Sequence, residues 1–169
     1  MKLRKMFTAG ILTISDKGWS GERQDKSGDA IRKVLSEIDV HIVNYDIVPD
    51  EKNLIAEKLT QWADKDGIDV IVTTGGTGLN PRDVTPEATL SVVDRVVPGF
   101  AEAMRAESLK KTPMAMLSRA VVGTRGNCLI INLPGSPKAV RECLETILPV
   151  LSHAVETLKG RVGECGTFE

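Results

Sequence analysis

The sequence predicts an α/β domain of three layers, an αβα sandwich in which helices cover both faces of a mostly parallel sheet. Apolar, β-branched runs alternate with helical patterns in the order strand, helix, strand, helix, strand, which implies crossover connections between parallel neighbours. These runs lack strict alternation of apolar and polar residues, as expected for strands buried on both faces. Two later strand-like runs flank a Gly-Asn pair, which predicts an antiparallel hairpin at one edge of the sheet.

The first half of the chain supplies the parallel strands. Strands are predicted at residues 7–15, 40–48 and 70–74, and a polar loop follows the first of them at 16–25. Ser27 is expected to cap the first helix, because a side-chain oxygen can accept from the free N–H groups of the first turn. The apolar residues of that helix recur at helical spacing: Ala30, Ile31, Val34, Leu35 and Ile38.

Prolines and glycines mark the later elements. Thr85 is predicted to cap a helix that has a proline in its first turn. Residues 119–125 and 128–133 are the arms of the predicted hairpin. Ser136 is expected to cap the last helix, and Pro149 to kink or divide it.

The composition suits one domain and excludes some function classes. The chain has 169 residues and 18.3 kDa, and we expect one domain over 1–158 with a loose tail over 159–169. A net charge of −1, from 22 basic and 23 acidic residues, argues against a general nucleic-acid binder. No apolar run approaches the ~20 residues needed to span a bilayer, and the start lacks a signal-peptide pattern. Three cysteines without a CxxC pair, Cys128, Cys143 and Cys165, favour free thiols and a cytoplasmic location.

Four polar or glycine-rich features follow predicted strands. They are Ser15 with Asp16, then Asp50, the glycine loop 74–78, and the segment 133–137. Ligands of open parallel sheets bind beyond the carboxyl ends of the strands. We therefore expect these four features to meet in one crevice, and their convergence is stronger evidence for a binding site than any one of them.

The glycine loop is the most informative of these features. It consists of Thr74, Gly75, Gly76, Thr77 and Gly78. Glycines let backbone N–H groups approach phosphate oxygens closely, although the Gly-Lys-Ser/Thr ending of a P-loop is absent. The alternative is a strand-to-helix turn whose glycines meet only dihedral needs, and the nearby Thr77, Arg82 and Asp83 argue against it.

Asp50 and Asp83 both follow sheet elements and precede predicted helices. Two carboxylates, together with substrate phosphates and water, suit a hard octahedral cation such as Mg²⁺. The alternative is that both acids only cap helices. The helix after Asp50 carries the apolar residues Leu54, Ile55, Leu59 and Trp62. Spacing alone leaves both interpretations open, and the two roles can coexist.

Two further segments could contact an anion. Ser118 could hydrogen-bond a phosphate oxygen and Arg119 could neutralise its charge, although a Ser-Arg pair is more often plain surface. The second segment is Leu133, Pro134, Gly135, Ser136 and Pro137. It leads a strand into a helix, whose free N–H groups and positive dipole end suit an anion or a nucleotide edge. A tight turn with a good cap is equally consistent with it.

These motifs resemble those of the molybdopterin adenylyltransferases of molybdenum-cofactor biosynthesis. The resemblance runs from about residue 8 to 158 and includes the matching domains of the plant two-domain enzyme and gephyrin. The long glycine segment with Arg-Asp-Val-Thr-Pro is quite specific, whereas the Leu-Pro-Gly segment is shared with related molybdopterin-binding domains. The segments that carry the resemblance are 12–18, 47–51, 73–86, 113–119 and 132–137.

The resemblance implies the fold of molybdenum-cofactor-biosynthesis proteins and a homotrimer that attaches AMP from Mg-ATP to molybdopterin, releasing pyrophosphate. It implies that Asp50, Asp83 and Ser118 are catalytic, with Mg²⁺ at the two acids and ATP as co-substrate. Binding contacts are implied along the glycine loop and the segment 133–137. Ser15, Asp16, Arg82 and Arg119 complete the expected contacts. Molybdate insertion is expected to belong to another protein that receives the product.

Three alternatives remain open from the sequence. The chain could be a catalytically silent molybdopterin-binding paralogue, like the cofactor-biosynthesis protein B of some lineages. It could be a trimeric scaffold, as gephyrin is in receptor clustering, or another nucleotide-dependent α/β enzyme that is indifferent to molybdopterin. The intact Asp50, Asp83 and Ser118 favour the enzyme.

Overall fold

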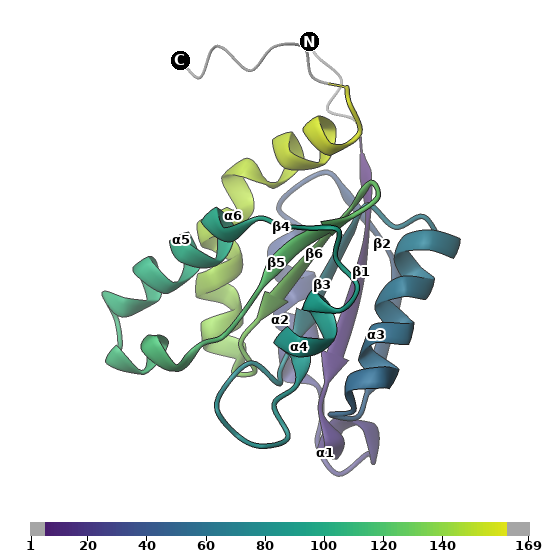
Figure 1. Ribbon diagram of the computed structural model, residues 1–169. Coiled ribbons are helices and arrows are strands. Elements are labelled where there is room, and N and C mark those ends of the chain that lie inside the picture. Colours follow the sequence, from purple (N-terminus) through teal and green to yellow (C-terminus); the bar gives the residue numbers. More distant parts are fainter. Residues whose placement is uncertain (1–5, 162–169) are drawn as a thin grey trace.

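A six-stranded sheet forms the middle layer of the computed structural model, which describes residues 6–161 (Figure 1). Its strands are β1 (Phe7–Ile14), β2 (Val40–Val48), β3 (Val70–Thr74), β4 (Arg95–Val96), β5 (Val122–Arg125) and β6 (Cys128–Leu133). Their order across the sheet is β2-β1-β3-β6-β5-β4. The first four in this order are parallel, whereas β5 runs antiparallel to β6 and β4 antiparallel to β5. The mostly parallel sheet and the antiparallel hairpin are therefore confirmed.

Helices cover both faces of this sheet (Figure 1). One face carries α2 (Lys26–Leu35), α5 (Pro98–Leu109) and α6 (Pro137–Leu158). The other carries α3 (Lys52–Thr60), its π-helical continuation η1 (Gln61–Lys65), and α4 (Thr85–Leu90). Neighbouring strand residues enter opposite cores: Ile11 and Ile131 face the first layer, while Leu12 and Ile130 face the second. The three-layer fold is confirmed, and burial on both faces explains why the strands are apolar throughout.

The strand order creates a switch point between β1 and β3. The chain leaves β1 for β2 on one side and later returns to β3 on the other side. Because the connections after β1 and β3 run to opposite faces of the sheet, a crevice opens between the carboxyl ends of these two strands. This is the edge at which the sequence analysis expects a ligand.

One predicted helix cap is replaced by a neighbouring residue. Asp25, not Ser27, caps α2, and its carboxylate accepts from the N–H of Gly28 at 2.9 Å. Ser27 instead donates its hydroxyl to the carbonyl of Gly135 at 2.7 Å. The prediction for Ser27 is therefore wrong, because a distant carbonyl takes the hydroxyl. The predicted cap at Ser136 is confirmed, since its side chain accepts from Ala139 N–H.

Asp50 and Thr85 are not helix caps either. The residues at the cap positions of α3 and α4 are Glu51 and Val84, and neither makes a capping side-chain hydrogen bond. The Asp50 carboxylate accepts from the N–H of Asp16, and the Thr85 hydroxyl donates to a carbonyl of the glycine loop. Rules for local capping fail here because partners from other loops satisfy these side chains.

Several element boundaries also differ from the prediction. The predicted loop 16–25 contains a short helix, α1 (Asp16–Trp19), and residues 119–121 precede β5 rather than belonging to it. The elements β4, α5 and the 3₁₀ helix η2 (Pro113–Leu117) were not predicted, so β4 forms the sheet edge outside the hairpin. The helix α6 is a single element, so Pro149 does not divide it.

The cysteines and the chain end complete the fold. Cys128 and Cys143 are buried and free. Cys165 and residues 162–169 of the predicted tail lie outside the described residues. Between residues 6 and 161, no helix combines the length and the apolar character that a membrane crossing requires.

A buried ion pair fastens the end of α6 to the sheet. Lys159 pairs with Asp69, and their side chains are 17% and 10% exposed. Asp69 also accepts from the N–H of Thr8 at 2.9 Å, while the Asp69 N–H donates to the Thr8 hydroxyl at 3.1 Å. This cluster lies where β1 and β3 begin, at the end of the sheet opposite the crevice.

Replacing Asp69 with alanine is expected to lower the free energy of unfolding by about 2 kcal/mol, because it removes the charged partner of the partly buried Lys159 ammonium and the acceptor of Thr8 N–H. Urea denaturation measures the loss. The matched control is Lys110→Met, which removes an exposed ion pair with Glu107 and should cost under about 0.5 kcal/mol. Equal losses in the two variants would contradict the role given to Asp69.

Candidate active site

Backbone hydrogen bonds tie the carboxyl ends of four strands together. The N–H of Ser15, after β1, donates to the carbonyl of Val48 at the end of β2 (2.9 Å). The N–H of Gly75, after β3, donates to the carbonyl of Leu133 at the end of β6 (3.3 Å). The predicted convergence of these strand ends at one edge is confirmed, and the loops that follow them are held close together.

Two cavities open at this edge and share a wall. The larger, about 910 Å³, is lined by the ends of β1 and β3 and the start of α2, and we name it the crevice. The smaller, about 490 Å³, is lined by the glycine loop, α5, η2 and α6, and we name it the side pocket. Both cavities are lined by Gly76, Asp83, Gly135 and Ser136. Ligands in the two cavities would therefore meet beside Asp83.

The predicted site residues divide between these cavities. Five predicted residues line only the crevice: Ser15, Asp50, Thr74, Gly75 and Pro137. Four predicted residues line only the side pocket: Thr77, Gly78, Ser118 and Pro134. Three predicted contacts with charged side chains, Asp16, Arg82 and Arg119, and the buried Leu133 line neither cavity.

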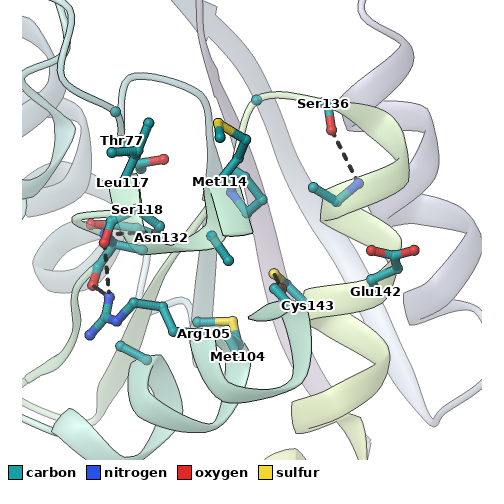
Figure 2. A pocket seen from close by; sticks show the side chains of 18 of the residues that line it. Thr77, Met104, Arg105, Met114, Leu117, Ser118, Asn132, Ser136, Glu142 and Cys143 are labelled. Carbon is teal, nitrogen blue, oxygen red and sulfur yellow. Dashed lines mark hydrogen bonds between the residues drawn. The ribbon is translucent and has the colours of Figure 1, made fainter. Parts of the chain in front are cut away.

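Figure 2 shows that the side pocket combines apolar and polar side chains. Met104, Met114 and Leu117 supply apolar surface, while Thr77 and Ser118 bring hydroxyl groups. Such a lining suits an organic ring system that carries a few polar groups. The crevice, by contrast, is lined mainly by polar and charged residues and glycines.

Two glycines allow the loop to pass between the strands. Gly75 has φ 98° and Gly76 has φ 66°, both in the left-handed region. A Cβ at Gly75 would lie 2.2 Å from the carbonyl oxygen of Ile14, and one at Gly76 would lie 2.3 Å from Oγ1 of Thr85. The loop geometry therefore requires glycine at both positions.

The same loop presents unused backbone donors. Among the described residues, no acceptor receives a hydrogen bond from the N–H groups of Gly76, Thr77 or Gly78. Consecutive free N–H groups form a concave anion-binding feature. The structure thus retains the property that the sequence analysis attributed to this loop.

Asp50 and Asp83 face the crevice from different loops. Asp50 and Asp16 are joined by reciprocal hydrogen bonds, each carboxylate accepting from the other residue's N–H at 3.0 Å. Burial raises the pKa of Asp50; the hydrogen bond from Asp16 N–H opposes that shift, and the charges of Asp16 and Asp83 add to it. Asp50 therefore carries its negative charge at a cost in the folded protein.

The donor set at this edge fits a hard divalent cation. Among residues 6–161, no group of three metal-ligating side chains occurs, so at most two such side chains would hold one ion, and Asp50 and Asp83 are the candidates. Mg²⁺ commonly takes one or two carboxylates and completes its shell with phosphate oxygens and water. A cation here would also offset the repulsion from Asp16 and Asp83, which adds to the effect of burial on the pKa of Asp50.

Arg82 braces the loops instead of lining a cavity. Its guanidinium donates to both carboxylate oxygens of Asp16, at 2.9 and 3.1 Å, and to Glu51 at 3.0 Å. The hydrogen bond from Arg82 is the main reason that the pKa of Asp16 is lowered. Arg82 and Asp16 thus connect the segment after the glycine loop to the loops after β1 and β2.

Two cations in the crevice were not predicted from the sequence. Arg23 and Lys26 line it, and neither side chain forms an ion pair or hydrogen bond with another described residue. They are therefore available to an anion. The available signal was their position: both lie in or just after the polar loop that follows the first strand, at the ligand-binding edge of the sheet.

Residues 10–153 match the family described as a probable molybdopterin binding domain. Molybdopterin adenylyltransferase of Helicobacter pylori (strain J99) is 47% identical over 153 residues, covering 89% of this chain and 87% of that protein. That of Escherichia coli (strain K12) is 43% identical over 140 residues, or 82% and 72% of the two chains. A crystal structure of the molybdopterin biosynthesis enzyme MoaB from Thermus thermophilus has a TM-score of 0.88 at 57% identity, covering 92% of this chain and 98% of that one.

These matches extend over the sheet and both helical layers. The domain is therefore an α/β fold of the molybdenum-cofactor-biosynthesis class. The chain belongs to the molybdopterin adenylyltransferase family and is an enzyme of molybdenum cofactor biosynthesis. The resemblance given by the sequence motifs is confirmed.

Asp50→Asn is expected to raise the unfolding midpoint of the metal-free protein at neutral pH, because the pKa of Asp50 is raised in the folded state. Such a group stabilises the fold below its unfolded pKa, and this contribution is lost as pH rises through the folded pKa. The asparagine side chain can still accept from Asp16 N–H. Thermal unfolding in EDTA over a range of pH measures the gain, which should vanish as the pH falls.

Asp16→Asn provides the control of opposite sign. The pKa of Asp16 is lowered, chiefly by Arg82, so its charge stabilises the fold above the unfolded pKa and this stability is lost as pH falls through the folded pKa. The variant should be less stable than the wild type at neutral pH. A fall in midpoint for both variants at neutral pH would show that the charge of Asp50 is not destabilising.

Proposed function

We propose that the enzyme transfers the adenylyl group of Mg-ATP to the terminal phosphate of molybdopterin, ahead of molybdate insertion. The observation that supports this proposal is the shared wall, since Asp83 and Gly76 border both cavities. Two phosphate-bearing ligands, one in each cavity, would meet at one carboxylate and one glycine nest. The names of the curated relatives supply molybdopterin as substrate and adenylyl transfer as the reaction.

The reaction exchanges one phosphorus–oxygen bond for another. An oxygen of the molybdopterin phosphate bonds to the α-phosphorus of ATP, and the bond from that phosphorus to the oxygen bridging the β-phosphate breaks. Pyrophosphate leaves with the bridging oxygen and its electron pair. The nucleophile is already anionic at neutral pH, so no strong general base is needed. This accords with cavities that neither of the two histidines lines.

The barrier is largely electrostatic, because two anions must approach and charge grows on the leaving group. The free N–H groups of residues 76–78 and the hydroxyl of Ser118 are placed to donate to phosphate oxygens. Arg23 and Lys26 bring positive charge to the crevice. Asp50 and Asp83 would hold Mg²⁺, which when bound neutralises phosphate charge. Alignment of both ligands at one wall supplies the entropic part.

Three further properties belong to the same proposal. The enzyme acts as a homotrimer, works in the cytoplasm, and hands its product to a separate molybdate-insertion protein. The family resemblance supports all three, and the composition supports the cytoplasmic location through its sparse cysteines.

Asp83→Ala is expected to lower the rate of pyrophosphate release from Mg-ATP and molybdopterin by at least ~100-fold, as for loss of a charge-stabilising group. The matched control is Asp66→Ala, which removes an exposed carboxylate bonded to Asn44 and lining neither cavity. The control should keep the wild-type rate. Turnover by Asp83→Ala at the wild-type rate would remove Asp83 from the mechanism.

The same assay separates the alternative functions. A silent paralogue would bind molybdopterin and release no pyrophosphate with Mg-ATP. Another nucleotide-dependent enzyme would bind ATP and ignore molybdopterin. Either result with the wild-type protein refutes the proposed reaction.

Light scattering tests the assembly independently of the chemistry. The expected mass is three times the 18.3 kDa of one chain. A monomeric or dimeric mass would contradict the proposed trimer, and the reaction would then still be judged by pyrophosphate release.

A further inference from the structure

Within the described part of the chain, the Arg119 side chain hydrogen-bonds to the segment 78–83, which begins at the end of the glycine loop, and to the helix α4. Its Nε donates to the carbonyl of Gly78 at 2.7 Å, and its Nη2 donates to the carbonyl of Asp83 at 2.8 Å. Its Nη1 pairs with the carboxylate of Glu87 in α4. Its own N–H also donates to the carbonyl of Thr77 at 2.9 Å. One residue therefore grips this segment at four points.

These hydrogen bonds fix the backbone on both sides of the turn between Gly78 and Asp83. Between Gly78 and Asp83 the chain turns back on itself, with the N–H of Asp83 donating to the carbonyl of Asn80 at 2.8 Å. The N–H of Asn80 in turn donates to the Asp83 carboxylate at 3.0 Å. Arg119 holds the backbone where this turn begins and where it ends. The place of the Asp83 carboxylate at the shared wall thus depends on the planar fork of Arg119.

Arg119 also links the two cavities through the chain itself. Its neighbour Ser118 lines the side pocket, as does Thr77, whose carbonyl accepts from Arg119 N–H. A shift of Arg119 would therefore move Ser118 and Asp83 relative to each other. The separation of these two groups is what alignment of two ligands requires.

The Arg119 guanidinium is already occupied by protein partners and is not available to bind a phosphate. It lines neither cavity, and its charge is already paired with Glu87, whose pKa it lowers. The second carboxylate oxygen of Glu87 is buried and accepts no hydrogen bond within the described part of the chain. Drawing Arg119 toward a ligand would break this ion pair and both hydrogen bonds to the loop carbonyls.

We propose that Arg119 is a positioning residue that acts through Asp83: it holds the loop backbone at Gly78 and Asp83, and so sets the carboxylate at the wall between the cavities. This inference rests on the proposed adenylyl transfer for its kinetic consequences. Its structural consequences, for cation binding and loop mobility, can be measured without turnover.

Arg119→Lys is the informative variant, because lysine keeps the charge and loses the fork. We expect kcat for pyrophosphate release to fall ~10- to 100-fold, as when a residue that holds a metal ligand in place is lost. We also expect Mn²⁺, used as the probe cation in the presence of ATP, to bind more weakly by electron paramagnetic resonance. The KM for molybdopterin should stay at its wild-type value.

Arg125→Lys is the matched control. Arg125 makes the same kind of contacts, with both carboxylate oxygens of Asp64 at 2.9 and 2.7 Å and with the carbonyl of Val92 at 2.7 Å. It lines neither cavity. This variant should lose stability as Arg119→Lys does, while keeping wild-type kcat and Mn²⁺ affinity.

The outcomes separate this inference from the proposed function. A raised KM for ATP or molybdopterin with unchanged kcat and Mn²⁺ affinity would make Arg119 a direct phosphate ligand and overturn the inference. Equal kcat and equal Mn²⁺ affinity in the two lysine variants would overturn it as well. Absence of pyrophosphate release by the wild type would refute the reaction instead. Hydrogen exchange then decides: faster exchange confined to residues 76–84 in Arg119→Lys supports the positioning role, and unchanged exchange there overturns it.

Discussion

The site depends on one close backbone approach, that of Gly75 to the carbonyl of Ile14. A Cβ at Gly75 would lie 2.2 Å from that oxygen, so only glycine lets the chain leave β3 against β1. On the other side the Gly75 N–H reaches the carbonyl of Leu133 and ties the loop to β6. Any side chain here would push the loop outward and separate Asp83 from Asp50. The two cavities share a wall because this loop is pinned between strands.

The sequence was sufficient to predict the layers and the edge at which the site lies. Strands buried on both faces must be apolar throughout, and that composition is visible without a structure. Parallel strands place all their carboxyl ends at one edge, so Ser15, Asp50 and the glycine loop had to lie near one another. The helix α5 escaped prediction because only Ala101 and Met104 of it are buried, which leaves too thin an apolar stripe for a helical period.

The roles of the polar side chains could not be derived from local sequence, because their partners are distant in the chain. Asp50 stands before a helix as a cap would, yet its carboxylate accepts from Asp16, 34 residues earlier. Arg119 has the charge expected of a phosphate ligand, yet the loop carbonyls and Glu87 satisfy its guanidinium. The side chains of Arg23 and Lys26 have no such partner in the described part of the chain and are left for the anion. Fixed hydrogen-bond partners, not residue type, thus separate bracing cations from binding ones.

Carboxylates at a phosphate site repel the ligand that the site must bind. Within the described residues, one of the three acids at the site is paired with an arginine, and two are not. Arg82 neutralises Asp16, so the charge nearest to Asp50 is paired outside the cavities. Among residues 6–161, no cation forms an ion pair with Asp50 or Asp83, which face the crevice, and burial raises the pKa of Asp50. An anion alone would raise it further, whereas a cation would lower it. On the proposed reaction, nucleotide and Mg²⁺ therefore favour each other's binding at this edge, and the acids select a nucleotide that carries its metal over one that does not.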